Sequence, residues 1–179
     1  GSLDRARWCL GAKVMNLSEK RCSLGNFRGV QCTERVVERD RLKSPFIYFG
    51  GKARCADLIW SRIGDVHNWI EPFMGSLAVT LARPHAPKVE TVNDLDDYLV
   101  NFWRSVQHDP DGVVEHADYP IMETDLHARH RYLMYGPQSK EFHQRMLEDP
   151  DYHDVRFAGW WVWGICQWIG SGWCSAKSA

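Results

Sequence analysis

Three short segments between residues 45 and 96 bring together glycines, acidic residues and a lysine, which are residue types that hold a charged organic ligand. They are Phe49-Gly50-Gly51-Lys52, Ile70-Glu71-Pro72-Phe73-Met74-Gly75-Ser76 and Thr91-Val92-Asn93-Asp94-Leu95-Asp96. Each segment borders a run that is typical of a strand or a helix, so backbone amides and acidic side chains fall at junctions where a ligand can bind. The spacing therefore predicts a cofactor site.

The middle segment has the pattern of a strand, a tight turn and a helix. Residues 66–70 are a short strand candidate, and residues 77–82 are apolar enough for a buried helix. Pro72 fixes φ before the turn, and Gly75 allows close approach to its backbone because it has no Cβ. An ordinary turn without a ligand has the same pattern, so this segment alone leaves both interpretations open.

An acidic residue after the next strand candidate strengthens the prediction. Residues 88–92 form that candidate, and Asp94 follows the glycine turn by about 20 residues. In doubly wound nucleotide-binding folds, a carboxylate at this place binds the ribose because it accepts both hydroxyl hydrogens. Asp94 is the candidate for this role, whereas Asp96 and Asp97 fall where a helix starts and are predicted to serve its N-terminus.

The three motifs, followed by the aromatic-rich residues 98–103, resemble the front half of the Dam-type DNA adenine methyltransferases, especially those carried by phages. The resemblance runs from about Pro45 to Cys174. It implies an α/β fold with an incomplete Rossmann-like, S-adenosylmethionine-dependent methyltransferase core and an added helical segment. It also implies double-stranded DNA as the partner, with methyl transfer to the exocyclic amine of adenine. An NAD-type fold is disfavoured because no G-x-G-x-x-G follows a strand candidate.

The same resemblance implies nine residues that bind S-adenosylmethionine. They are Tyr48, Gly50, Gly51, Lys52, Glu71, Phe73, Gly75, Ser76 and Asp94. Lys52 is suited by its charge to the methionine carboxylate, and Asp94 takes the place of the acid that binds the adenosine ribose. Relatives often have a second glycine or small residue at the position of Leu77, so we expect this turn to lie slightly further from the cofactor.

The motif that performs amino methylation in these enzymes is absent from the sequence. It is of the Asp-Pro-Pro-Tyr type, in which the acid and a carbonyl accept the amine hydrogens while the aromatic ring stacks on the flipped base. The segment Asp149-Pro150-Asp151-Tyr152 lacks the second proline, and we interpret it as a break between a helix and a loop. No catalytic residue is therefore assigned.

Two functional interpretations stay open. One is the front part of an enzyme whose catalytic half is supplied elsewhere, with a complementary chain as an expected partner. The other is an inactive remnant or a module that binds S-adenosylmethionine without transfer. A parallel sheet that has only its first strands leaves an apolar edge exposed, which predicts poor behaviour in isolation or a partner.

Composition and charge vary along the 179 residues. Hydrophobic residues make up 44% and charged residues 25%, which is typical of a soluble globular protein. Residues 1–43 contain ten Lys and Arg against five Asp and Glu, and the rest contains 12 against 18. We expect residues 1–43 to be a basic, poorly ordered extension with a short helix over 34–41. Residues 44–110 are the predicted cofactor-binding part, and residues 111–179 a helical segment of the same domain that leads toward target recognition.

Cysteine and histidine usage gives no metal or disulfide pattern. The six cysteines have no C-x-x-C spacing, and we interpret them as reduced thiols of a protein in the cytoplasm of a bacterial or phage-infected cell. His127 and His130 are three residues apart on a helix candidate. Because they lack Cys or acidic partners in a recognisable pattern, a metal site there is disfavoured.

The second half of the chain is predicted to be helical. Besides the helix candidates over residues 34–41 and 77–82, the expected helices cover residues 53–63, 98–106, 111–117, 123–135 and 140–147. The Trp-rich residues 157–169 are too few to span a bilayer, which takes about 20, and they favour a helix buried on most faces. The alternative is that Trp168, residues 170–172 and Trp173 shape a pocket in which an extruded base stacks.

Overall fold

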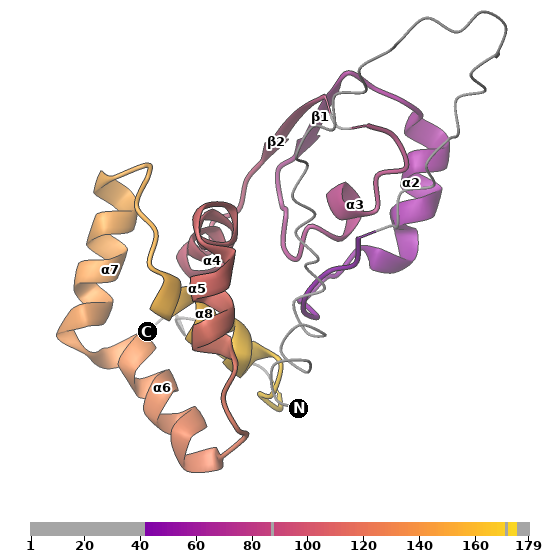
Figure 1. Cartoon of the computed structure of the whole chain (residues 1–179). Helices are drawn as coiled ribbons and strands as arrows, with labels where there is room; N and C mark the ends of the chain where they lie inside the picture. Colours follow the sequence, from indigo (N-terminus) through magenta and orange to yellow (C-terminus); the bar gives the residue numbers. More distant parts are fainter. Residues whose placement is uncertain (1–41, 87, 171, 175–179) are drawn as a thin grey trace, which may run out of the picture.

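The computed structural model describes residues 42–86, 88–170 and 172–174, which form a small α/β part and a larger helical part (Figure 1). In chain order the elements are the 3-10 helix η1 (Ala53–Cys55), α2 (Ala56–Ile63), β1 (Asn68–Glu71), α3 (Ala78–Leu81), β2 (Val89–Val92), α4 (Asp97–His108), α5 (Pro110–Ala117), α6 (Glu123–Tyr135), α7 (Pro137–Glu148) and α8 (Val155–Ile165). Of the predicted basic extension, residues 1–41 with the helix over 34–41 lie outside the described residues. The predicted boundary between residues 110 and 111 stays a prediction.

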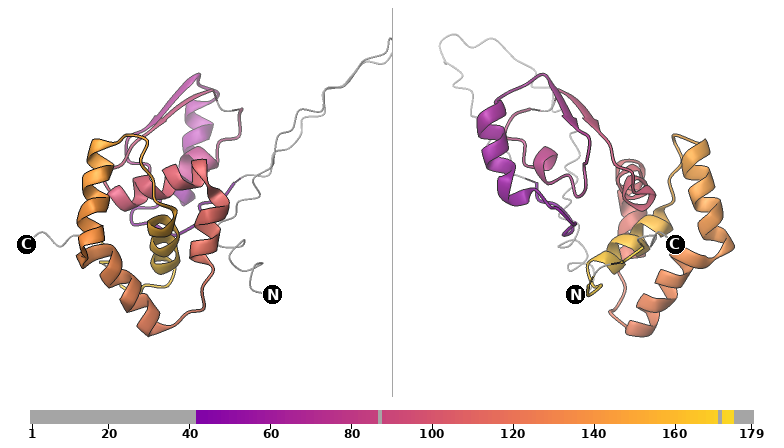
Figure 2. Two further views of the ribbon diagram at one scale, coloured as in Figure 1. Left: turned by 60° about the vertical axis from the view of Figure 1, so that its left-hand side comes forward. Right: turned by 180° about the vertical axis from the view of Figure 1, so that it is seen from behind.

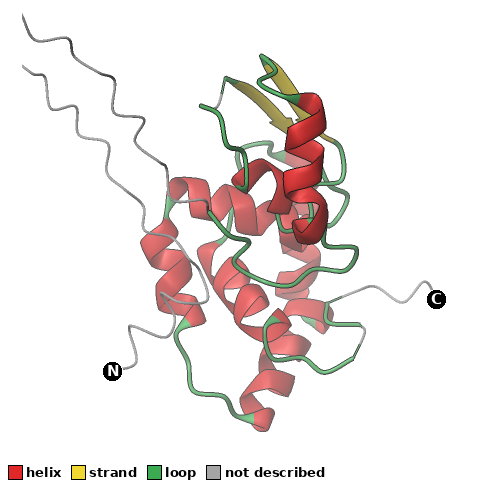
Figure 3. Cartoon of the chain, turned by 90° about the vertical axis from the view of Figure 1, so that its right-hand side faces the viewer, coloured by secondary structure: helices red, strands yellow, loops and turns green. Residues whose placement is uncertain are grey.

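The strands β1 and β2 pair in parallel, with Asn68 opposite Val89 and Glu71 opposite Val92. Parallel strands need a crossover connection, and here it carries the short helix α3. Both α2 and α3 lie on the same side of the two strands (Figure 3), and the reverse view agrees (Figure 2). The described residues thus form a mainly helical fold with a small parallel sheet, and the predicted Rossmann-like core stays a prediction.

An aromatic cluster joins α2, α3 and β1. Trp60 of α2 is buried and packs against Val79 of α3 and against the ring of Trp69 from β1, with 4.7 Å between the two ring centroids. The indole N–H of Trp60 donates to the carbonyl of Val79 at 2.7 Å. The amphipathic pattern of this helix is confirmed, except that its predicted first turn forms η1.

Aspartates begin three helices of the helical part. Asp96, Asp109 and Asp154 stand immediately before α4, α5 and α8, and each carboxylate accepts hydrogen bonds from backbone amides of the first turn. This use of an aspartate satisfies N–H groups that a helix leaves free at its start, and it confirms the N-terminal role predicted for Asp96. Pro137 opens α7, three residues before the predicted start at residue 140, because the first helical position does not need the N–H that proline lacks.

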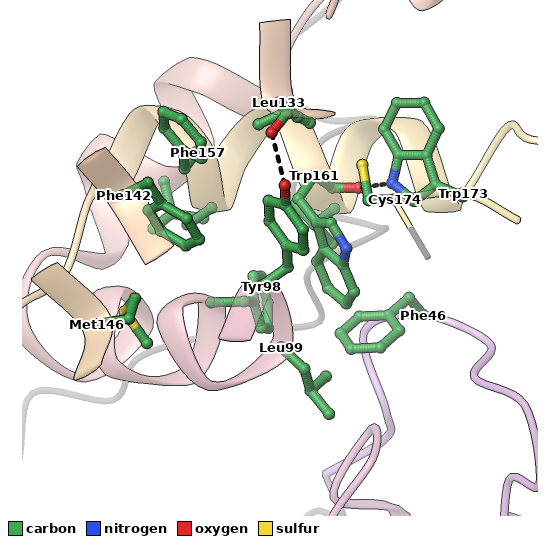
Figure 4. Packing of buried hydrophobic residues seen from close by; sticks show 14 of the residues in the cluster. Phe46, Tyr98, Leu99, Leu133, Phe142, Met146, Phe157, Trp161, Trp173 and Cys174 are labelled. Carbon is green, nitrogen blue, oxygen red and sulfur yellow. Dashed lines mark hydrogen bonds between the residues drawn. The ribbon is translucent and has the colours of Figure 1, made fainter. Parts of the chain in front are cut away.

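The large core lies between α4, α6, α7 and α8, and Figure 4 shows its packing. Its largest fully buried side chains are Trp161, Phe102, Phe142, Leu99 and Leu133. Two hydrogen bonds cross this core: the hydroxyl of Tyr98 donates to the carbonyl of Leu133 at 2.6 Å, and the indole of Trp173 donates to the carbonyl of Trp161 at 3.0 Å. The predicted buried Trp-rich helix is confirmed as α8, although it begins at residue 155 and ends at residue 165.

A buried amide sets α4 against the start of α8. Asn101 is fully buried, and its Nδ2 donates to the carbonyl of Asp154 at 2.9 Å while its Oδ1 accepts the backbone N–H of Asp154 at 2.7 Å. Both polar ends of the side chain are therefore satisfied by one residue. This pairing fixes the register between the two helices.

α5 packs closely on α8 at Gly159. A Cβ at this position would lie 2.4 Å from the Cβ of His116 and 2.8 Å from the carbonyl oxygen of Val113, so α5 would have to move. We expect Gly159→Ala to lower the free energy of unfolding by about 1–3 kcal/mol, the usual cost of overpacking, even though alanine is the better helix former. Urea unfolding measures this change, with the exposed Glu115→Ala of α5 as the control. An increase in stability would contradict the close packing of the two helices.

Candidate cofactor site

A pocket of about 210 Å³ lies where the three sequence motifs meet. Its lining residues are Tyr48, Phe49, Gly50, Gly51, Lys52, Phe73, Met74, Gly75, Ser76, Ala78 and Asp94. The pocket adjoins the residues that follow the carboxyl ends of both strands, which is where ligands bind in open α/β sheets. All nine predicted site residues except Glu71 line it. The sequence prediction missed Phe49, Met74 and Ala78, and their only signal is adjacency to the motif residues.

The carboxylate of Asp94 ties the two strand ends together. Its Oδ2 accepts the backbone N–H of Gly75 at 3.0 Å, and its Oδ1 accepts that of Leu95 at 2.9 Å. A backbone hydrogen bond also connects the two strand ends, since the N–H of Met74 donates to the carbonyl of Asn93 at 2.9 Å. Oδ1 of Asp94 also accepts the backbone N–H of Asp96 at 3.3 Å. Because a carboxylate oxygen has two acceptor sites, Oδ2 of Asp94 retains one site for a hydrogen bond from a ligand.

Gly75 is enclosed by aromatic side chains. Its φ of +49° is a conformation that glycine adopts without steric cost. A Cβ there would lie only 3.1 Å from Cδ1 of Tyr48, so the tyrosine ring packs directly on this backbone. On another side, the indole N–H of Trp103 donates to the carbonyl of Gly75 at 3.0 Å. The glycine is thus required both by the backbone conformation and by the approach of Tyr48.

Lys52 faces the pocket and forms an ion pair with a buried acid. Its Nζ lies 3.1 Å from Oε1 of Glu71 and donates to the carbonyl of Phe73. Glu71 is 4% exposed, and its Oε2 accepts the hydroxyl hydrogen of Thr80 at 2.6 Å. The structure therefore places Glu71 behind Lys52, where it holds the ammonium group at the pocket. Direct contact of Glu71 with a cofactor stays a prediction.

The first motif starts a helix later than predicted. The sequence predicts a helix over residues 53–63, but residues 53–55 form the 3-10 helix η1 and α2 begins only at Ala56. Gly50 has a φ of +70°, and the N–H of Gly51 donates back to the carbonyl of Tyr48 at 3.0 Å. These glycines thus form a tight turn that brings Tyr48 and Lys52 to the same pocket.

Leu77 has a backbone conformation that usually belongs to glycine. Its φ is +52° and its ψ is 28°, which is the left-handed region that non-glycine residues adopt only at a cost. Its side chain is nevertheless buried in the large core. The turn after Gly75 therefore keeps a glycine-like backbone at Leu77.

The alternative base pocket near the Trp-rich helix finds little support. Trp173 is buried and so close to Gly164 that a Cβ there would meet its ring. Trp168 stacks on His130 with 5.0 Å between the ring centroids. Ser171, which belonged to this prediction, lies outside the described residues. Trp173 is therefore part of the core, which agrees with the interpretation of a buried helix.

Among the described residues, His127 and His130 are not part of a cluster that could hold a metal ion. In residues 42–86, 88–170 and 172–174, no cluster of three or more His, Cys, Asp or Glu side chains could hold a metal ion. Burial, together with the neighbouring His127, lowers the pKa of His130 below its usual value. Across the same part of the chain, no helix combines the length and the apolar character needed to cross a membrane.

Comparison with protein families agrees with the site. The family model described as D12 class N6 adenine-specific DNA methyltransferase matches residues 48–152, an interval that contains all nine predicted site residues. Searches of curated proteins and of solved structures found no match. The resemblance to the Dam-type enzymes is confirmed. Because the matched interval covers more than half of the sequence, the chain belongs to the D12 class of N6 adenine-specific DNA methyltransferases.

Proposed function

We propose that this chain binds S-adenosylmethionine and provides the cofactor half of a methyl transfer to the exocyclic amine of adenine in double-stranded DNA. The observation that supports this best is the pocket, where three motifs that are distant in sequence meet beside two parallel strands. In this proposal the small sheet belongs to a Rossmann-like core. The protein acts in the cytoplasm of a bacterial or phage-infected cell.

The polar groups of the pocket match the ends of the cofactor. Oδ2 of Asp94 accepts a ribose hydroxyl hydrogen in addition to the backbone N–H of Gly75, and Lys52 faces the methionine carboxylate. Glu71 keeps Lys52 at the pocket in the absence of a ligand, since the ammonium lies 3.1 Å from its carboxylate. When bound, the cofactor supplies a methyl group on a positively charged sulfonium, and the sulfur is a good leaving group because it departs as a neutral thioether. No metal is needed for that chemistry.

The aromatic side chains of the pocket suit the adenine ring. Phe49 and Phe73 both line the pocket, and both are exposed although they are large and apolar. A flat ring that stacks on such side chains removes apolar surface from water and stabilises the complex. The pocket volume of about 210 Å³ is below the range of about 300–1,000 Å³ that encloses a whole small ligand. These residues therefore hold one part of the cofactor while the rest remains open to the substrate.

The transfer step needs groups from outside this sequence. Tyr152, in the segment that superficially resembles the catalytic motif, packs against Phe142 in the core and lies beside the guanidinium of Arg145, 4.0 Å from ring centroid to Cζ. The sequence holds no Asp-Pro-Pro-Tyr motif. A complementary chain that carries this motif is therefore part of the proposal, and the alternative is a module that binds S-adenosylmethionine without transfer.

The small sheet supports such a partner. In the described residues β1 and β2 pair only with each other, so each has an unpaired edge. Ile70 and Val89 are exposed on them. Unpaired strand edges with apolar side chains favour the addition of further strands. A chain that carries the catalytic motif on an added strand would cover this surface.

Isothermal titration of the 179-residue chain with S-adenosylmethionine tests the proposal, with Lys52→Met as the informative variant. We expect this substitution to weaken binding about tenfold, because it removes a hydrogen-bonded charge. Binding of methylthioadenosine, which lacks the carboxylate, should change little. Lys88→Met is a matched control, since Lys88 is also 37% exposed and also pairs with an acid at 3.1 Å, but at Asp65.

The titration and a transfer assay separate the alternatives. A folded chain that does not bind S-adenosylmethionine would overturn the proposed function. Binding together with methyl incorporation into DNA, after addition of a polypeptide with the Asp-Pro-Pro-Tyr motif, would support the enzyme. Binding without incorporation under the same conditions would favour the binding module.

A further inference from the structure

Tyr48 of the first motif and Asp96 of the third motif meet through one hydrogen bond. The hydroxyl of Tyr48 donates to Oδ2 of Asp96 at 3.0 Å. The other oxygen, Oδ1, accepts the backbone N–H groups of Tyr98 and Leu99 at 3.0 and 3.3 Å, and so begins α4. The two carboxylate oxygens therefore have separate partners, one in a helix and one in the pocket wall.

The hydrogen bond fixes where the ring of Tyr48 lies. This ring packs on the backbone of Gly75 on the pocket side, and its other neighbour is Phe46, which meets it edge-on with 6.1 Å between the ring centroids. A tyrosine side chain has several staggered rotamers, and only one that directs the hydroxyl to Asp96 also keeps the ring on Gly75. The position of the ring and the shape of the pocket wall are thus coupled to the carboxylate.

The environment keeps this pair in the forms that can hydrogen-bond. Burial, reinforced by the negative charge of Asp96, raises the pKa of the Tyr48 hydroxyl, so it stays protonated and donates at neutral pH. Burial also raises the pKa of Asp96, while hydrogen bonds from Tyr48 and from the start of α4 oppose that shift. A buried carboxylate needs such donors, so the hydroxyl of Tyr48 has a defined task.

We propose that Asp96 is a positioning residue of the cofactor pocket, which holds the ring of Tyr48 against Gly75 and so shapes the wall that S-adenosylmethionine contacts. This inference rests on the proposed function. It adds to the helix-capping role of Asp96, because a cap requires only Oδ1. It also explains why an acid suits this position better than another capping residue, since serine is too short to reach both partners.

The substitution Asp96→Ser separates the two roles. Serine is a good first residue for a helix, so α4 keeps its cap, but the hydroxyl of Tyr48 loses its acceptor. We expect S-adenosylmethionine to bind about fivefold more weakly to Asp96→Ser and to Tyr48→Phe, the effect of one ordinary hydrogen bond. The double variant should bind no more weakly than either single variant, because both remove the same interaction.

Asp154→Ser is the matched control, since Asp154 caps α8 in the same way with hydrogen bonds of 2.9 and 3.0 Å and does not line the pocket. Its affinity should equal that of the wild type. A second readout does not need the ligand: the α-carbon of Gly75 lies beside the ring of Tyr48, whose ring current affects the NMR shifts of its protons. These shifts should move in Asp96→Ser but not in Asp154→Ser.

Three results would overturn the inference. They are wild-type affinity in Asp96→Ser, additive losses in the double variant, and unchanged Gly75 shifts. Failure of the wild-type chain to bind S-adenosylmethionine would instead overturn the proposed function, together with the part of the inference that concerns the cofactor. If the wild-type chain does not bind the cofactor but the NMR shifts of Gly75 change in Asp96→Ser, the result would still support that Asp96 positions the ring of Tyr48.

Discussion

Asp94→Ala is expected to weaken the binding of S-adenosylmethionine about 30-fold, which corresponds to about 2 kcal/mol. The substitution removes the acceptor that we assign to the ribose hydroxyls. It also removes the acceptor of the Gly75 N–H and of the Leu95 N–H, at 3.0 and 2.9 Å, so the glycine turn is no longer tied to the end of β2. Isothermal titration measures the loss.

Asp94→Asn distinguishes the two contributions. The amide keeps one acceptor oxygen for Leu95 but presents N–H hydrogens to the N–H of Gly75. We therefore expect Asp94→Asn to restore only part of the affinity that Asp94→Ala loses. Asp65→Ala is the control, because Asp65 is an exposed acid of the same part of the chain and pairs with Lys88 outside the pocket. Unchanged affinity in both Asp94→Ala and Lys52→Met would remove the site assignment.

Trp161→Ala is expected to destabilise the fold by about 3–5 kcal/mol, the usual cost of removing a large buried aromatic side chain. Trp161 is 1% exposed and meets Phe46 edge-on at 5.2 Å between ring centroids and Phe102 at 5.9 Å. It therefore joins α8 both to α4 and to the segment that carries the first motif. Urea or thermal unfolding followed by far-ultraviolet circular dichroism measures the change.

Ile169→Ala supplies the comparison for this variant. Ile169 is a large apolar residue shortly after the same helix, but its side chain is almost fully exposed. Its removal should change the stability by less than about 0.5 kcal/mol. A loss in Trp161→Ala as small as that in Ile169→Ala would show that α8 does not organise the core.

The site was largely predictable because its residues cluster in three local motifs. Tyr48, Lys52, Gly75 and Asp94 each fall beside a glycine turn or a strand end, and chain geometry brings such places together in a parallel sheet. The contributions of Asp96 and Trp103 were not predictable in the same way. Their partners, Tyr48 and Gly75, are 48 and 28 residues away, and nothing in the local pattern indicates those hydrogen bonds.

The bounds of an element were predictable where its own residues determine them, and less predictable where tertiary contacts determine them. The bounds of α6 follow from residues 123–135 alone, and β2 differs from its prediction by one residue. The start of α2 and the left-handed backbone of Leu77 do not follow from periodicity. The buried side chain of Leu77 offsets the cost of its backbone conformation, and that burial is a tertiary contact.

The pocket is fastened to the helical core as well as to its own strands. Gly75 is held by the indole of Trp103 from α4, and Phe46, two residues before Tyr48, is buried against Phe102 and Trp161. A ligand that binds only the folded chain adds about 1.4 kcal/mol of stability for each tenfold excess over its dissociation constant. Because of these connections, that free energy would protect backbone amides of α4 and α8 from hydrogen exchange, far from the atoms that the ligand touches. Ligand binding at the pocket beside the small sheet would thus be detected as slower hydrogen exchange in these helices.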